Sequence, residues 1–173
     1  YNGGTCWLKS GSNLQPIHYS SGYSICGYIK KRGGDGVPYG RLAVSGKHVV
    51  SAATGQPVQL RGMSLFWSQW MGQFYNADTV RALKCSWNTN VVRAAMGVEQ
   101  GGYLENSERE MQKVFSVVDA AIANGMYVIV DWHDHNAIDH RSQAVNFFSQ
   151  VSQKYGSQPN IIYETFNEPL QVS

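Results

Sequence analysis

Four apolar, strand-like segments recur along this chain, and a segment with helical periodicity separates each from the next. The strand-like segments span residues 58–63, 90–96, 126–132 and 161–166, and the helical segments span 78–84, 107–124 and 144–155. The second helix has the clearest signals, because Ser107 and Glu110 form a capping box and Gly125 follows the last apolar position. Buried strands that alternate with amphipathic helices are joined by right-handed crossovers. The order therefore predicts an α/β fold with a parallel sheet.

Two parallel architectures fit this order, a doubly wound sheet and a (β/α)8 TIM barrel. No Gly-x-Gly-x-x-Gly motif follows the first strand-like segment, so a dinucleotide-binding wound sheet loses support. Polar residues follow the carboxyl ends of the other three strands: Arg93, Asp131 with His133, and Asn167 with Glu168. In a TIM barrel those ends converge on the active site. We therefore expect a TIM barrel, of which this chain holds about the first four strands.

The amino-terminal part of the chain differs from the rest in composition and lacks helical periodicity. Residues 1–29 hold many turn formers with Cys6 and Cys26, which indicates a partial cysteine-containing module, and the Gly-rich residues 30–40 are typical of a linker. The barrel is expected over 41–173, beginning with short antiparallel strands. We expect Cys6 and Cys26 to be oxidised in a secreted, extracellular protein, with buried free thiols as the alternative.

Composition narrows the classes of partner. With 43% hydrophobic and 15% charged residues, the chain is typical of a globular domain, and it has no apolar run of the roughly 20 residues that span a bilayer. The net charge is only +2, and the basic residues are dispersed, so the electrostatic potential is too weak to indicate nucleic-acid binding. We therefore expect neither a nucleic-acid partner nor a membrane span, and an uncharged substrate is compatible.

Glu168 is the first candidate for catalysis. It follows an apolar strand, lies between Asn167 and Pro169, and is poorly explained by packing. Partial burial would favour the protonated form of such a carboxylate and suit it to proton transfer. We expect Pro169 to hold the backbone of Glu168 extended. A solvated loop acid is the alternative for Glu168, and a turn-closing residue is the alternative for Asn167.

Arg93 lies within a buried strand, where an unpaired guanidinium would be very unfavourable, so we expect it to meet a carboxylate. It would then be either half of a structural ion pair or the positioning partner of a catalytic acid.

The stretch "DWHDHN" allows two hypotheses. His133 and His135 point to one side of an extended strand, and with Asp131, Asp134 and a later His140 they could hold a metal. The spacing matches no strong zinc pattern, however. A strand-end histidine that hydrogen-bonds a sugar hydroxyl explains the stretch equally well.

Aromatic residues crowd the loop after the first strand-like segment: Trp67, Trp70, Phe74 and Tyr75. Pyranose rings present apolar C–H faces that stack on aromatic rings, so this cluster suits a glycan cleft. Each ring could equally be part of the loop's own core.

Together with "QLRGMS", "NVVRAAM" and "VIVDWHDHN", the stretch "IIYETFNEPL" resembles the first half of a glycoside hydrolase family 5 catalytic domain of the endoglucanase type. The resemblance implies retaining cleavage of β-1,4-glucan without a cofactor or metal, by an enzyme that is monomeric when complete. It also implies that Glu168 is the general acid/base, Asn167 contacts the sugar 2-hydroxyl, Arg93 supports the nucleophile and His133 contacts substrate. We add Trp67, Trp70, Tyr75 and His135 as expected substrate contacts.

Retaining cleavage needs a second carboxylate, which in this family follows the seventh strand. The chain ends soon after its fourth, so we expect a fragment that lacks the nucleophile and is inactive alone. Glu99 and Glu105 lie in the loop after the second strand, and Glu164 is expected to support the site from within its strand. The loop "SLFWSQW", and Gly97 where some members have Tyr, depart from many relatives.

Three further hypotheses complete the sequence-based expectations. The opening "NGGTCWLK" resembles the cysteine-containing segment of a PAN/apple module. A non-catalytic glycan-binding truncation using Trp67 and Trp70 is one alternative function. A metal-dependent barrel hydrolase using His133 and His135 is the other.

Overall fold

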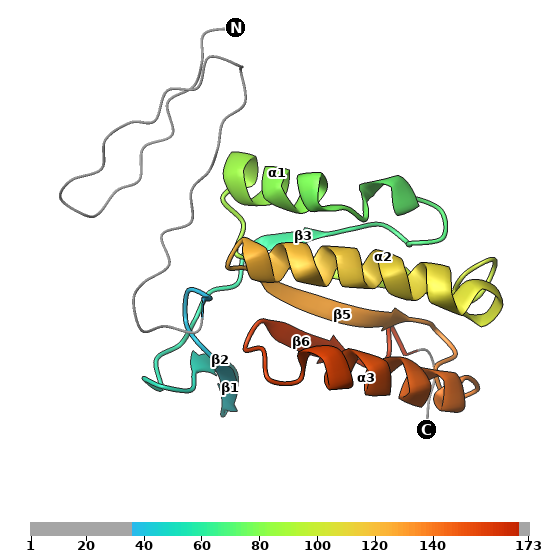
Figure 1. Ribbon diagram of the computed structural model, residues 1–173. Coiled ribbons are helices and arrows are strands. Elements are labelled where there is room, and N and C mark those ends of the chain that lie inside the picture. The colour runs from blue at the N-terminus through green and yellow to red at the C-terminus, as the bar shows by residue number, and fades with distance from the viewer. Residues whose placement is uncertain (1–35, 170–173) are drawn as a thin grey trace, which may run out of the picture.

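The computed structural model describes residues 36–169 (Figure 1). Its elements follow one another in the order β1 (Leu42–Ser45), β2 (His48–Ser51), β3 (Gly62–Ser64), η1 (Gly72–Phe74), α1 (Ala77–Trp87), β4 (Val91–Gly97), α2 (Tyr103–Ala123), β5 (Tyr127–His133), α3 (Arg141–Tyr155) and β6 (Ile161–Glu164). The expected module, with Cys6 and Cys26, lies outside the described residues. No helix within 36–169 is long and apolar enough to cross a membrane.

The strands β3, β4, β5 and β6 form one parallel sheet in sequence order. A helix joins each strand to the next, and Figure 1 shows α1, α2 and α3 along one side of the sheet. This is the predicted βαβ repetition. A separate antiparallel hairpin, β1–β2, lies near the end of the sheet opposite the strand tips in Figure 1, and its turn includes Gly46.

The first helix begins and ends with local signals. The side chain of Asn76 accepts a hydrogen bond from the Thr79 amide at 2.9 Å, which satisfies one free donor of the first turn of α1. Asn88 ends α1 in the left-handed region with φ of 52°, a conformation that asparagine tolerates better than most residues.

The predicted capping box of α2 was wrong. The helix begins at Tyr103 and is kinked at Asn106, which has φ of −139°. Glu110 does not reach back to a helix end, because it is fully buried and bonded to other side chains. The prediction that the helix ends at Gly125 was close, since α2 ends at Ala123 and Gly125 has φ of 61°.

Two strand predictions need correction. The strand expected over 58–63 is β3 at Gly62–Ser64, and its residues are exposed rather than buried, because β3 pairs on one side only in the described sheet. Gly62 is required there, since a Cβ would overlap the carbonyl of Val91 on β4. The strand expected over 161–166 ends at Glu164.

Alternate residues of the strands enter two different cores. Val92 and Val128 are fully buried between the sheet and the helices, with Met96 and Val130. On the opposite face, Val91 and Tyr127 form a smaller cluster that Val37, Tyr39 and Leu42 help to cover. Successive side chains of a strand point to opposite faces, so this division follows from the sequence.

The face opposite the helices changes character along the strands. The apolar cluster on this face includes Val91 of β4, Ile129 of β5 and Ile162 of β6. Each of these strands carries a charged residue two positions later, and side chains two positions apart point to the same face. These charged residues, nearer the carboxyl ends of the strands, are Arg93, Asp131 and Glu164. An apolar layer at one end of this face is thus followed by a charged layer at the other. The candidate site lies in the charged layer.

Candidate active site

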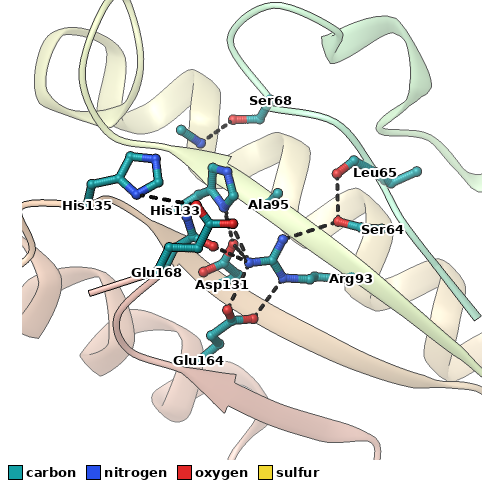
Figure 2. Close-up of polar contacts among 12 residues, drawn as sticks. Ser64, Leu65, Ser68, Arg93, Ala95, Asp131, His133, His135, Glu164 and Glu168 are labelled. Carbon is teal, nitrogen blue, oxygen red and sulfur yellow. Dashed lines mark hydrogen bonds and ion pairs between the residues drawn. The ribbon is translucent and has the colours of Figure 1, made fainter. Parts of the chain in front are cut away.

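Arg93 is the centre of the charged layer. Its Nε and Nη2 donate to the two carboxylate oxygens of Glu164, each at 2.8 Å, and Nη2 also donates to Oδ1 of Asn167 at 2.8 Å (Figure 2). Nη2 lies 2.8 Å from Oδ2 of Asp131. These contacts raise the pKa of Arg93, chiefly through the hydrogen bonds to Glu164. The prediction that Arg93 meets a carboxylate is confirmed, and it meets two.

Asp131 is fully buried beside Arg93. Its Oδ2 lies 2.6 Å from Nδ1 of His133, while its Oδ1 has no hydrogen-bond partner among residues 36–169. Burial raises the pKa of Asp131, and the hydrogen bond from His133 and the charge of Arg93 oppose that rise. The carboxylate therefore holds both a guanidinium and an imidazole in fixed positions.

Trp67 covers the charged layer from the loop after β3. Its ring meets His133 edge to face, with centroids 4.2 Å apart, and stacks on Trp70 at 5.1 Å. His135 lies 5.8 Å from Trp67. Trp70 is 49% exposed, so its ring is available to a ligand. The structure thus brings together four residues expected to contact substrate: Trp67, Trp70, His133 and His135. The rings of Trp67, Trp70 and His135 form an aromatic wall beside His133.

Glu168 follows β6 at the same edge of the sheet, as Figure 2 shows, with Oε2 3.8 Å from Nδ1 of His135. Its side chain is 77% exposed. Within residues 36–169, therefore, Glu168 is not partly buried as expected. The expected extended backbone was also wrong, since φ is 45°, a strained value before proline. Asn167 is buried, and its Nδ2 has no partner among residues 36–169.

Tyr75 does not belong to the ligand-facing surface. It is 4% exposed, and its hydroxyl shares its one hydrogen between the carbonyl oxygens of Phe66 and Ala95, which lie 2.8 and 2.7 Å away. Burial raises its pKa well above the ordinary value. The expectation that Tyr75 contacts substrate is corrected: Tyr75 ties the loop after β3 to β4.

The geometry does not support a metal site built on His133 and His135. Within residues 36–169, neither histidine belongs to a group of three possible ligand atoms close enough together to share one ion. Within residues 36–169, Glu99, Asp134 and His140 bring ligand atoms within 4.8 Å of one another.

Those three side chains are already engaged in polar contacts. Nδ1 of His140 lies 2.7 Å from Oδ2 of Asp134, and Nε2 of His140 lies 3.8 Å from Oε1 of Glu99. Oδ1 of Asp134 accepts from the amide of Asn136. These contacts join the loop after β4 to the loop after β5.

Sequence reasoning missed the buried partners of the loop after β3. Glu110 is fully buried and accepts a hydrogen bond from Ser68, which is also fully buried. A signal for Glu110 was present, because Val114 and Val117 lie four and seven residues later on the buried face of α2. A charged residue on an apolar helix face requires a partner.

Comparison with protein families decides the classification. Residues 51–173 match the model "Cellulase (glycosyl hydrolase family 5)". The chain belongs to glycosyl hydrolase family 5. Endoglucanase Z of Dickeya dadantii is 51% identical over 136 residues, which are 76% of this chain and 32% of that protein. An endoglucanase of Clostridium saccharobutylicum is 41% identical over 133 residues, covering 75% of this chain and 30% of the relative.

Solved structures agree with this family 5 assignment. A protein of Cytophaga hutchinsonii is 59% identical, with a TM-score of 0.75 over 77% of this chain and 43% of that one. The catalytic domain of a Thermobifida fusca endoglucanase is 34% identical, with a TM-score of 0.74 over 78% of this chain and 45% of its own. The predicted barrel fold is confirmed at the level of the family, and this family 5 chain spans less than half the length of each of these relatives.

Proposed function

We propose that this chain forms the acid/base side of a retaining endo-β-1,4-glucanase. The observation that carries the proposal is that Glu168 and Asn167 follow β6 at the edge where Arg93, Asp131 and His133 form one hydrogen-bonded group. Two supports come from relatives. Three of the similar proteins described above are endoglucanases, and a variant of the Thermobifida fusca domain has been solved in complex with cellotetraose.

Glu168 acts as the general acid in the first step. It gives its proton to the glycosidic oxygen while a second carboxylate, roughly 5 Å away, attacks the anomeric carbon and forms a glycosyl-enzyme. In the second step Glu168 takes a proton from water, and that water displaces the carboxylate with net retention of configuration. We propose that the second carboxylate belongs to a part of the protein beyond residue 173.

Asn167 is oriented to donate to substrate. Arg93 donates to its Oδ1, so the amide plane is fixed and Nδ2 is left as a buried donor without a partner among the described residues. A buried donor is unfavourable until it is satisfied, which favours a hydroxyl of the sugar beside the scissile bond. Nε2 of His133 is similarly left for substrate, because Nδ1 faces Asp131.

Glu164 is not the missing nucleophile. Both of its carboxylate oxygens accept from Arg93, and this fork-to-fork pairing holds the carboxylate within the sheet. It supports Arg93, as expected from its place inside the strand. We further propose an extracellular enzyme, since a polymeric glucan is reached from outside the cell.

The test is Glu168→Gln in the complete protein, with Glu108→Gln on the exposed surface of α2 as the matched control. We expect kcat/KM on cello-oligosaccharides to fall by about 10²- to 10⁴-fold for Glu168→Gln and to stay unchanged for the control. A 2,4-dinitrophenyl glycoside needs no protonation of its leaving group, so its glycosylation step should be largely retained. Equal activity of Glu168→Gln and the unaltered enzyme would refute the acid/base assignment.

A further inference from the structure

A buried polar cluster lies behind the aromatic loop, outside the proposed catalytic group. Ser68 and Glu110 are both fully buried, and the Ser68 hydroxyl donates to Oε2 of Glu110. The same hydroxyl oxygen accepts from the amide of Gly97, the last residue of β4, at 3.0 Å (Figure 2). The amide of Ser68 donates to the carbonyl of Ala95 at 3.1 Å. Ser68 is thus hydrogen-bonded both to α2 and to the carboxyl end of β4.

Glu110 is compensated by two cations on its own helix. Oε1 lies 2.7 Å from Nζ of Lys113 and 3.1 Å from Nε of Arg109. Lys113 also donates to the carbonyl of Ser68 at 2.8 Å, so it contacts both members of the pair. A fully buried carboxylate is maintained only where such partners satisfy it. Every polar group of Ser68, in backbone and side chain, has a partner in this cluster.

Ser68 directly follows Trp67, the residue whose ring packs against His133 at 4.2 Å. The chain turns at this point, because the carbonyl of Trp67 accepts from the amides of Trp70 and Met71. Ser68 is anchored toward the helices, while Trp67 lies against the charged layer. Fixing Ser68 therefore fixes the direction in which the indole of Trp67 leaves the loop.

We propose that Glu110 is a positioning residue that acts through Ser68 to hold Trp67 against His133 and so to shape the glucan-binding surface. The inference rests on the proposed function and extends it to a group that touches neither substrate nor the reacting carboxylates. The ring of Trp67 contributes to substrate binding rather than to proton transfer. Loss of its anchoring therefore raises KM more than it lowers kcat.

The test uses the complete enzyme with Glu110→Gln, Ser68→Ala and the double variant. Ser68→Ala removes the link and leaves the ion pairs of Glu110 with Lys113 and Arg109 in place. Each single change should raise KM for a soluble cello-oligosaccharide by roughly tenfold and change kcat little. In the double variant the effects should not add, because both residues act through one contact.

The control is Tyr155→Phe. This change removes the hydrogen bond of a buried hydroxyl to Asp119 at 2.8 Å, at the packing of α3 on α2. It should lower thermal stability without changing KM. If Tyr155→Phe and Ser68→Ala alter stability and KM in the same proportion, the role of the cluster is purely structural and the proposal fails. Additive effects of Glu110→Gln and Ser68→Ala on KM would also overturn it.

A second measurement separates this proposal from the proposed function. With 5-fluorotryptophan incorporated, the ¹⁹F resonance of Trp67, assigned by Trp67→Phe, should shift in Ser68→Ala and in Glu110→Gln. It should not shift in Tyr155→Phe. An inactive unaltered enzyme would refute the proposed function alone, whereas an unmoved Trp67 resonance in both variants would refute the positioning role alone.

Discussion

Nδ1 of His133 lies 2.6 Å from the carboxylate of Asp131, its neighbour but one on β5. The acceptor requires the imidazole to carry a hydrogen on Nδ1, so Nε2 faces away from the carboxylate. Arg93 contacts the same carboxylate oxygen at 2.8 Å. One buried carboxylate therefore sets the tautomer of the histidine and the position of the arginine together (Figure 2).

Asp131→Asn should change how stability depends on pH. Burial, the largest influence, raises the pKa of Asp131 in the folded state, so the folded state holds this proton more strongly than the unfolded state. The contribution of Asp131 is then fully present below its unfolded pKa and is lost as pH rises through the higher folded pKa. We expect the unfolding free energy of the unaltered protein, relative to the variant, to fall with pH across that acidic window. Urea unfolding at a series of pH values measures it.

A constant difference between the two proteins over the acidic range would contradict this account of Asp131. His133→Gln serves as the companion variant. It removes the hydrogen bond that opposes the rise, so the folded-state pKa of Asp131 should rise further and the window should extend to higher pH.

Arg93→Lys should lower kcat/KM of the complete enzyme by about 100-fold, or roughly 2.7 kcal/mol of transition-state stabilisation. Lysine keeps the charge but cannot donate to both oxygens of Glu164 and to Asn167 at once. The amide of Asn167 would then lose its fixed orientation. Arg81→Lys is the control, since Arg81 pairs with Asp78 on the exposed surface of α1 and should tolerate the change. Comparable losses in both variants would refute a specific role for the guanidinium.

Tyr75→Phe should reduce stability and leave activity nearly intact. The carbonyl of Phe66 loses its donor, whereas that of Ala95 keeps the amide of Ser68. One buried carbonyl left unsatisfied costs about 1–2 kcal/mol. Denaturant unfolding should show that loss, and kcat/KM should stay within about twofold because the ring does not face substrate. A large rise in KM without loss of stability would instead indicate that Tyr75 contacts substrate.

The strand-end residues were predictable because two regular patterns specify them. Continuous apolar runs indicated β4 and β5 as buried strands, and parallel strands bring their carboxyl ends to one edge, so Arg93, Asp131 and Asn167 were expected together. The requirement that a buried guanidinium be paired then predicted carboxylate partners for Arg93 from the amino-acid sequence alone. Glu164 was expected to support the site from within the last strand, and it pairs with Arg93 there.

The residues missed by sequence analysis depend on long-range contacts that no local pattern encodes. Tyr75 and Trp70 lie in one aromatic-rich loop, yet Tyr75 is buried and Trp70 is half exposed. The hydroxyl of Tyr75 reaches one backbone carbonyl of β4, that of Ala95. Glu110 matched a capping box locally, but the tertiary contact with Ser68 prevailed. Glu168 is 77% exposed, and its one ion pair within residues 36–169 is the 3.8 Å contact with His135.

Gly97 is the last residue of β4 and lies against the side chain of Gln69. The side chain of Gln69 occupies the place where a Cβ on Gly97 would lie, and its Nε2 donates to the carbonyl of Glu99 at 3.2 Å. Gly97→Ala should displace this flexible side chain and cost about 1 kcal/mol, because the loop after β4 loses a hydrogen bond. Gln69→Ala alone should cost a similar amount.

The double variant Gly97→Ala, Gln69→Ala should be no less stable than either single variant, since the added methyl then enters space that the glutamine has left. A thermodynamic cycle from urea unfolding of the four proteins gives the coupling, expected at about 1 kcal/mol. Gly46 in the turn of the β1–β2 hairpin provides the control, because a Cβ there meets nothing within 4 Å but φ is 57°, so Gly46→Ala should destabilise without coupling to Gln69→Ala. Strict additivity of Gly97→Ala and Gln69→Ala would show that the glutamine does not depend on the missing side chain.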